Sequence, residues 1–137
     1  MKIVATMVAL GLLTACATKD DPGLDRMLAG QSQKSGSALD RAVSAADRHP
    51  FGSQQNPVRA TMPAGERAYL ARLRCSDGQA PRFERMGSFG AGPYGNILDG
   101  YTVDCGAAAP GKVQIFMDMY HGGYVESRPV PGFTITG

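Results

Sequence analysis

The chain has 137 residues, a formal net charge of +2 and no tryptophan. This length favours a single domain, and the near-neutral charge excludes the polybasic surface on which nucleic-acid binding depends, so no nucleic acid is expected as a partner. The glycine and proline counts of 18 and 9 favour turns and short strands over long helices.

The first 16 residues contain an export pattern. Lys2 precedes an apolar run over residues 3–13, which is much shorter than the ~20 residues that cross a bilayer and is typical of a signal peptide. The run ends in Leu13-Thr14-Ala15-Cys16. This motif resembles the lipobox of bacterial lipoproteins, and the resemblance implies cleavage before Cys16 and removal of residues 1–15.

The lipobox resemblance also predicts how the protein is held. It implies a diacylglyceryl group on the Cys16 thiol and an acyl chain on the new amino terminus, and several chains together anchor a protein stably to a membrane. Ala17, where an aspartate favours inner-membrane retention, indicates the outer membrane, facing the periplasm. The inner membrane and the cell surface are the alternatives. Apart from this lipid, no cofactor is expected.

Residues 16–55 form a predicted polar tether. Asp21-Pro22 is typical of a helix start, and Leu24, Met27 and Leu28 would form a short apolar stripe. A second helix is predicted over residues 37–49, because Leu39, Ala42, Val43 and Ala46 recur at helical spacing and Ser37 can cap them.

From residue 56 the pattern changes to the alternation that is typical of strands. The segment 113–120 is apolar on both faces, which predicts a central strand, and residues 87–96 are expected to form a loop. We therefore expect a mainly β domain over residues 56–137, a small antiparallel sandwich or barrel of five to six short strands. The predicted strands cover residues 69–75, 82–86, 97–105, 113–120 and 133–136.

Three cysteines are present, and the lipid would use one of them. Cys75 and Cys105 remain, and in an oxidising compartment they are expected to pair as a disulfide. Two free buried thiols are the alternative.

A metal site is the first alternative to a purely structural domain. On a regular strand, Met117, Met119 and His121 point to the same side, and thioether and imidazole groups suit copper. The simpler interpretation is that the two methionines continue the apolar pattern of Val113 and Ile115 into the core.

The sequence offers little for catalysis. Asp118 is expected on the opposite face from His121, which separates the acid from the base. No nucleophile motif is present, and Asp99 and Asp104 have no second carboxylate at a recognisable spacing. A hydrolase acting on envelope material would require a carboxylate pair that converges in the fold.

The leading hypothesis is a non-enzymatic lipoprotein that binds an envelope protein or polymer. Its expected contact surface combines Arg72 and Arg74, from an arginine-rich stretch, with Phe89 and Tyr94, from a glycine-rich loop. The commoner role of such arginines is to form a solvated strand face.

Overall fold

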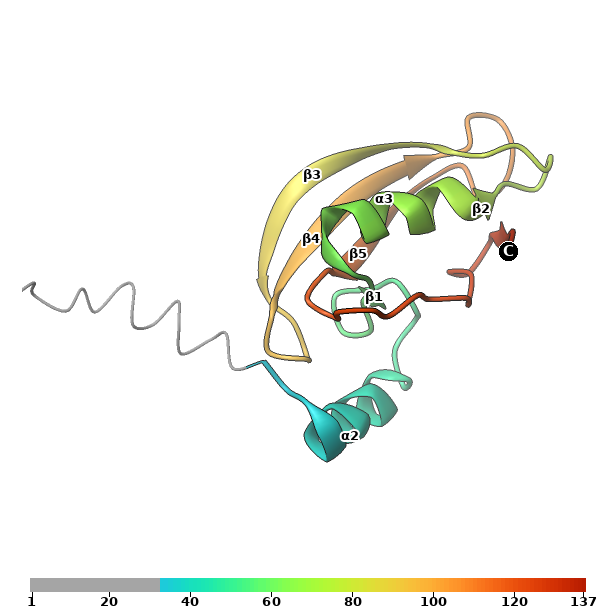
Figure 1. Ribbon diagram of the computed structural model, residues 1–137. Helices are drawn as coiled ribbons and strands as arrows, with labels where there is room; N and C mark the ends of the chain where they lie inside the picture. Colours follow the sequence, from blue (N-terminus) through green and yellow to red (C-terminus); the bar gives the residue numbers. More distant parts are fainter. Residues whose placement is uncertain (1–32) are drawn as a thin grey trace, which may run out of the picture.

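The computed structural model describes residues 33–137, in which strands predominate (Figure 1). The predicted signal peptide, Cys16 and the helix expected after Asp21 lie outside these residues. The prediction of a small, mainly β domain is confirmed. In chain order the elements are α2 (Gly36–Ala46), β1 (Val58–Arg59), α3 (Met62–Arg72), β2 (Leu73–Arg74), β3 (Arg82–Ala91), β4 (Ile97–Asp104), β5 (Lys112–Asp118) and β6 (Thr134–Ile135).

The main sheet has four strands in the order β1-β5-β4-β3. β3, β4 and β5 are antiparallel neighbours, whereas β1 runs parallel to β5, with Val58 opposite Met117. β5 therefore lies inside the sheet, as its two apolar faces predicted. The short strands β2 and β6 form a separate antiparallel pair, so the strand expected near the C-terminus is present.

The strand predicted over residues 69–75 was wrong, because most of this segment belongs to α3. Glu66, Tyr69 and Leu70 are buried on this helix, and Leu73 is buried directly after it. These positions recur at i, i+3, i+4 and i+7, which is the period of a helix face. The alternation of period 2 holds only for the two residues of β2. The helical spacing starts at Glu66, upstream of the segment that was predicted as a strand.

The core lies between α3 and one face of the main sheet (Figure 1). Leu70 and Leu73 are fully buried, and burying each such side chain contributes roughly 1.5–3 kcal/mol. The buried cluster consists of Val58, Ala60, Tyr69, Leu70, Leu73, Cys75, Tyr101, Val103, Ile115, Met117, Val130 and Phe133.

The loop predicted over residues 87–96 is shorter than expected, because β3 continues to Ala91. The pairing of β3 with β4 shifts register twice, between Arg85 and Gly87 and between Ser88 and Ala91. Gly87 has a φ of 141°, a conformation that only glycine adopts easily, and β-bulges use such positions. The glycines that suggested a loop instead bend a strand.

The predicted disulfide between Cys75 and Cys105 is present, with a Cα–Cα distance of 5.8 Å. It joins the residue after β2 to the residue after β4, and Cys75 is buried against the core. In the chain-entropy account, closing a loop of 30 residues stabilises the fold by roughly 3–4 kcal/mol.

The helix predicted over residues 37–49 corresponds to α2, which begins one residue earlier and has Ser35 rather than Ser37 at its N-cap. α2 lies to one side of the layers formed by α3 and the sheet (Figure 1). The backbone N–H of Lys34 donates to the carbonyl of Tyr94 at 2.9 Å, which ties the chain before α2 to the β3–β4 turn. Within residues 33–137, no helix combines the length and apolar character that a membrane span requires.

Candidate functional site

A small cavity of about 320 Å³ lies between α3 and the chain segment that follows β5, which runs beside α3 (Figure 1). We call it the α3 slot. Gly65 and Ala68 give α3 a face without bulk, because residues three positions apart lie side by side on a helix. The slot is lined by Arg59, Ala60, Thr61, Gly65, Ala68, Tyr69, Arg72, Gly123, Tyr124, Val125 and Glu126.

Two half-buried arginines line the slot. The Arg59 guanidinium lies 4.0 Å from the centroid of the Tyr124 ring, a cation–π contact. Arg72 donates to the backbone carbonyl of Glu126. The ion pairs formed among residues 33–137 include neither Arg59 nor Arg72. Neither guanidinium therefore forms an ion pair with a carboxylate of the described residues.

Glu126 also lines the slot, but its carboxylate is engaged elsewhere. It accepts hydrogen bonds from the backbone N–H groups of Ser127 and Arg128, at 3.0 and 2.9 Å, and from the Tyr124 hydroxyl at 3.1 Å. Burial acts to raise the pKa of Glu126, but the side chain, backbone N–H and charge of Arg128 outweigh it and hold the pKa below its ordinary value. Glu126 is thus a charged group already balanced by Arg128.

The edge of the slot carries exposed apolar side chains. Val125 is 75% exposed and Met62, which follows Thr61 in the chain, is 57% exposed. Met62 has a φ of 55°, in the left-handed region that costs a non-glycine residue roughly 1–2 kcal/mol. The backbone N–H of Met62 donates to the carbonyl of Met119 at 2.7 Å, which holds this conformation at the start of α3.

A buried carboxylate cluster lies between α3 and β4. The Tyr101 hydroxyl donates to Oε2 of Glu66 at 2.8 Å, and Arg85 donates to both oxygens of Asp99 at 2.9 and 2.7 Å. The pKa of Glu66 is raised to about 7: burial, the largest cause, and the charge of Asp99 raise it, and the Tyr101 hydrogen bond lowers it in part. The sequence identified Asp99 as a candidate carboxylate but not Glu66. The two residues are close only because α3 packs across the sheet, and the sequence pattern does not show this.

Glu66 is fully buried, and Arg85 occupies the oxygens of Asp99. The second carboxylate that the sequence suggested, Asp104, lies apart from this cluster and pairs with Arg82 at 3.5 Å and Lys112 at 3.9 Å. A carboxylate pair does converge in this fold, but it consists of Glu66 and Asp99 and lies under α3.

Asp118 and His121 are neighbours, contrary to the prediction that they face opposite ways. Nε2 of His121 lies 3.2 Å from Oδ2 of Asp118, while Asn96 donates to both oxygens of Asp118 at 3.1 and 3.0 Å. The strand ends at Asp118, so the alternation of faces does not continue to His121. The Thr61 hydroxyl lies 2.8 Å from the backbone carbonyl of His121 and 3.1 Å from that of Tyr124. It therefore contacts the backbone of this turn.

The copper ligands proposed from the sequence do not share one side of a strand. Met117 is fully buried in the hydrophobic core, Met119 lies beyond the end of β5, and His121 faces Asp118. Among residues 33–137, no group of three or more His, Cys, Asp or Glu side chains is arranged to hold a metal ion.

The four predicted contact residues do not form one surface. Arg72 lines the slot, whereas Arg74 donates to the backbone carbonyls of Ala71 and Leu73. Phe89 is 38% exposed, and its ring packs edge-on against Phe116 with centroids 5.1 Å apart.

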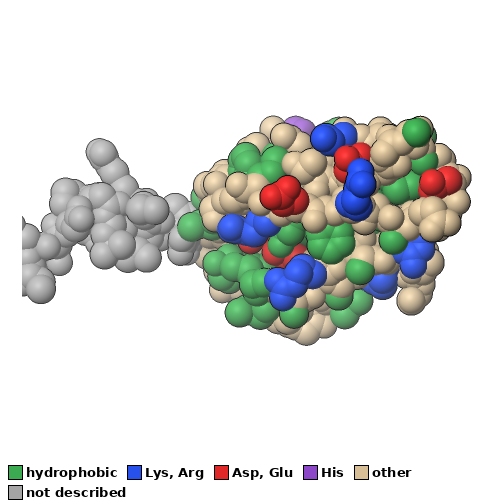
Figure 2. Space-filling view, turned by 90° about the horizontal axis from the view of Figure 1, so that it is seen from above, with side chains coloured by type: hydrophobic (Ala, Val, Ile, Leu, Met, Phe, Trp, Pro, Cys, Tyr) green, Lys and Arg blue, Asp and Glu red, His purple; other side chains and the backbone are tan. Residues whose placement is uncertain are grey.

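The fourth predicted contact residue, Tyr94, is only 1% exposed, so its assignment to the surface was wrong. The turn that carries it folds inward, and the Tyr94 ring packs against His121 with centroids 5.5 Å apart. Figure 2 shows acidic and basic side chains interspersed among hydrophobic ones on the face seen from above, so this face has no single-signed patch.

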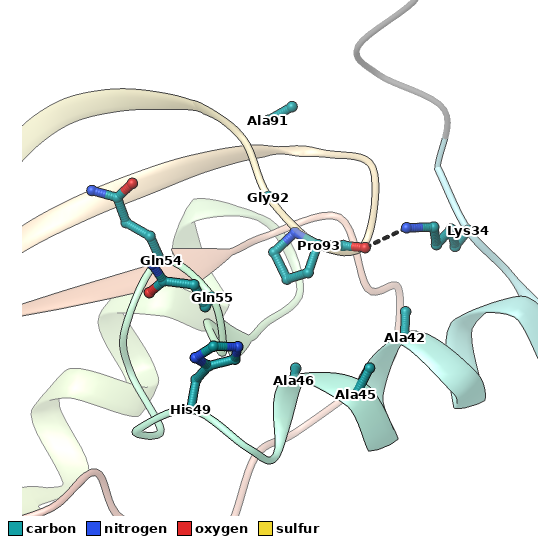
Figure 3. Close-up of a pocket in the computed structure, with 10 residues that line it drawn as sticks. All are labelled: Lys34, Ala42, Ala45, Ala46, His49, Gln54, Gln55, Ala91, Gly92 and Pro93. Atoms are coloured by element: carbon teal, nitrogen blue, oxygen red, sulfur yellow. Dashed lines mark hydrogen bonds between the residues drawn. The ribbon is translucent and has the colours of Figure 1, made fainter.

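A larger cavity of about 610 Å³ separates α2 from the β3–β4 turn (Figure 3). Its walls are mainly small, with Ala42, Ala45 and Ala46 from α2 opposite the turn. Its cation, Lys34, already donates to the Pro93 carbonyl. Because this cavity brings no uncompensated charge together, the α3 slot is the stronger candidate.

The comparisons add no relative to this geometry: no family model, curated protein or solved structure matches the chain.

Proposed function

We propose that this protein is a membrane-anchored lipoprotein of the cell envelope whose small β domain binds a partner in the periplasm. The anchor is the lipid on Cys16, and the outer membrane is its location. Two independent features support the proposal. The segment Leu13-Thr14-Ala15-Cys16 has the residue types of a lipobox, and the Cys75–Cys105 disulfide suits a small domain in an oxidising compartment.

The observation that carries the binding function is the α3 slot, in which Arg59 and Arg72 line a largely apolar cavity and form no ion pair with another described residue. Guanidinium groups are common anchors in recognition surfaces, since they combine charge with several donors. Of the four contact residues predicted from the sequence, Arg72 lines this slot.

Catalysis and metal binding receive less support from the same residues. A hydrolase needs its carboxylates within reach of the substrate, whereas Glu66 is fully buried beneath α3. A copper site through Met117 would require a side chain that packs in the core to leave it. We therefore favour binding over both alternatives.

The anchor is tested by metabolic labelling with radioactive palmitate and by the intact mass of the detergent-extracted protein. We expect label on the wild-type chain, and a mass that lacks residues 1–15 and includes added acyl groups. The Cys16→Ser variant should take up no label. Wild-type protein that keeps residues 1–15 and carries no lipid would refute the proposed anchor.

A further inference from the structure

We propose that the α3 slot binds a short acidic peptide segment of an envelope protein, with carboxylates at Arg59 and Arg72 and an apolar side chain over Gly65 and Ala68. This inference rests on the proposed binding function and names the class of partner. Charge, shape and exposed apolar surface each support it.

The charge of the slot favours an anionic partner. Arg59 and Arg72 are half-buried, so their attraction to an anion is screened less than at a fully exposed site. Arg72 lies at the C-terminal end of α3 and Arg59 precedes its N-terminal end. The Arg59 guanidinium contacts the Tyr124 ring and the Arg72 guanidinium contacts the Glu126 carbonyl. Because the two groups come from different elements and contact different residues, a peptide with two carboxylates can pair with each of them.

The shape of the slot favours a peptide over a folded element. Its volume of about 320 Å³ is near the lower end of the ~300–1,000 Å³ found for ligand pockets. The floor contributed by Gly65 and Ala68 is apolar and without bulk, so a single aliphatic side chain fits between α3 and the segment 123–126. A folded helix or strand pair would not enter it.

Exposed apolar residues extend the contact beyond the two charges. Val125 and Met62 are the most exposed of the large hydrophobic residues in the described chain. Val125 lines the α3 slot, and Met62 follows Thr61, which also lines it. Exposed apolar side chains around a polar anchor are typical of protein-binding surfaces. They are unnecessary for binding a free inorganic anion.

The test is selection of a random peptide library on the full-length protein purified in detergent. We expect enrichment of peptides in which acidic residues flank an apolar one. Three variants should weaken binding of the selected peptides at least about tenfold, a change of about 1.4 kcal/mol. They are Arg59→Gln, Arg72→Gln and Ala68→Leu, the last of which fills the slot and leaves both guanidinium groups in place.

The matched controls are Arg67→Gln and Ala71→Leu, which change exposed residues of the same helix outside the slot. They should bind as the wild type does. Urea unfolding of every variant separates lost binding from lost folding, because Arg59 and Arg72 also contact their own chain.

Three results would overturn the inference. The first is the absence of enrichment for acidic peptides, and the second is binding that Ala68→Leu leaves unchanged. The third is displacement of the selected peptides by a synthetic peptide of residues 18–30, which would assign the slot to the chain's own acidic segment. None of these results bears on palmitate labelling, so failure of the slot is distinguishable from failure of the anchor.

Discussion

Tyr101 donates a hydrogen bond to Glu66 at 2.8 Å and thereby joins β4 to α3 inside the core. Both side chains are buried, and Oε1 of Glu66 has no hydrogen-bond partner among the described residues. A buried carboxylate with one unpaired oxygen is more stable in its neutral form. The contact therefore links folding to pH.

Replacement of Glu66 by glutamine should change how stability depends on pH. Burial, the largest cause, raises the pKa of Glu66 from 4.5 to about 7 in the folded state. The folded state binds this proton more tightly, so the contribution of Glu66 to the unfolding free energy is complete below pH 4.5 and falls as the pH rises to about 7. The total change is roughly 3 kcal/mol at about 1.36 kcal/mol per pH unit.

Urea denaturation of wild type and Glu66→Gln across this pH range measures the effect. Relative to the wild type, the variant should be more stable at alkaline than at acidic pH. Glu84→Gln, an exposed substitution on β3, is the control and should show a constant difference. A constant difference for Glu66→Gln as well would show that Glu66 titrates at its ordinary pKa.

The strained backbone of Met62 predicts a reversed order of stability for two substitutions. At a φ of 55°, Met62→Gly relieves strain that Met62→Ala retains, so the glycine variant should be more stable than the alanine variant by about 1 kcal/mol. Thermal or urea unfolding gives this difference. At Ala64 of the same helix the order should be the usual one, with Ala64→Gly less stable than alanine by about 1 kcal/mol. The same order at both positions would contradict the strain at Met62.

Gly92 is expected to tolerate no side chain. A Cβ placed there lies 2.5 Å from Cδ2 and 2.8 Å from Cγ of Leu98, a side chain that is only 1% exposed and is enclosed by its neighbours. Gly92→Ala should therefore lower the unfolding free energy by roughly 1–3 kcal/mol, as overpacking in other cores does. Gly122, which has no atom within 4 Å of an added Cβ, provides the control, and Gly122→Ala should be nearly neutral. Equal unfolding midpoints in urea for the two variants would show that the β3–β4 turn yields without cost.

Loss of the Cys75–Cys105 bond should reduce stability by roughly 3–4 kcal/mol. Unfolding in urea with and without a thiol reductant measures this effect. The double variant Cys75→Ala, Cys105→Ala is the control, since the reductant should leave its midpoint unchanged. Free thiols in the unreduced wild-type chain, detected by a thiol reagent after unfolding, would contradict the bond.

Several features of the fold could be predicted from local patterns alone. The alternation of β5, the helical spacing in α2 and the count of cysteines each depend on residues close in sequence or on chemistry that needs no geometry. For this reason the interior strand, the helix α2 and the disulfide were all anticipated. The failure at α3 came from a segment where two periods overlap, and only packing of Glu66, Tyr69 and Leu70 against the sheet decides between them.

By itself, the sequence determined the strand-rich character of the domain and the pairing of Cys75 with Cys105. It also supplied the lipobox pattern on which the proposed anchor depends. Only the tertiary structure decided which polar residues meet. Glu66 and Tyr101 are 35 positions apart, and Arg59 of β1 and Arg72 of α3 line one slot. Such contacts depend on how a helix crosses a sheet and where a strand ends, and no local spacing encodes either of these.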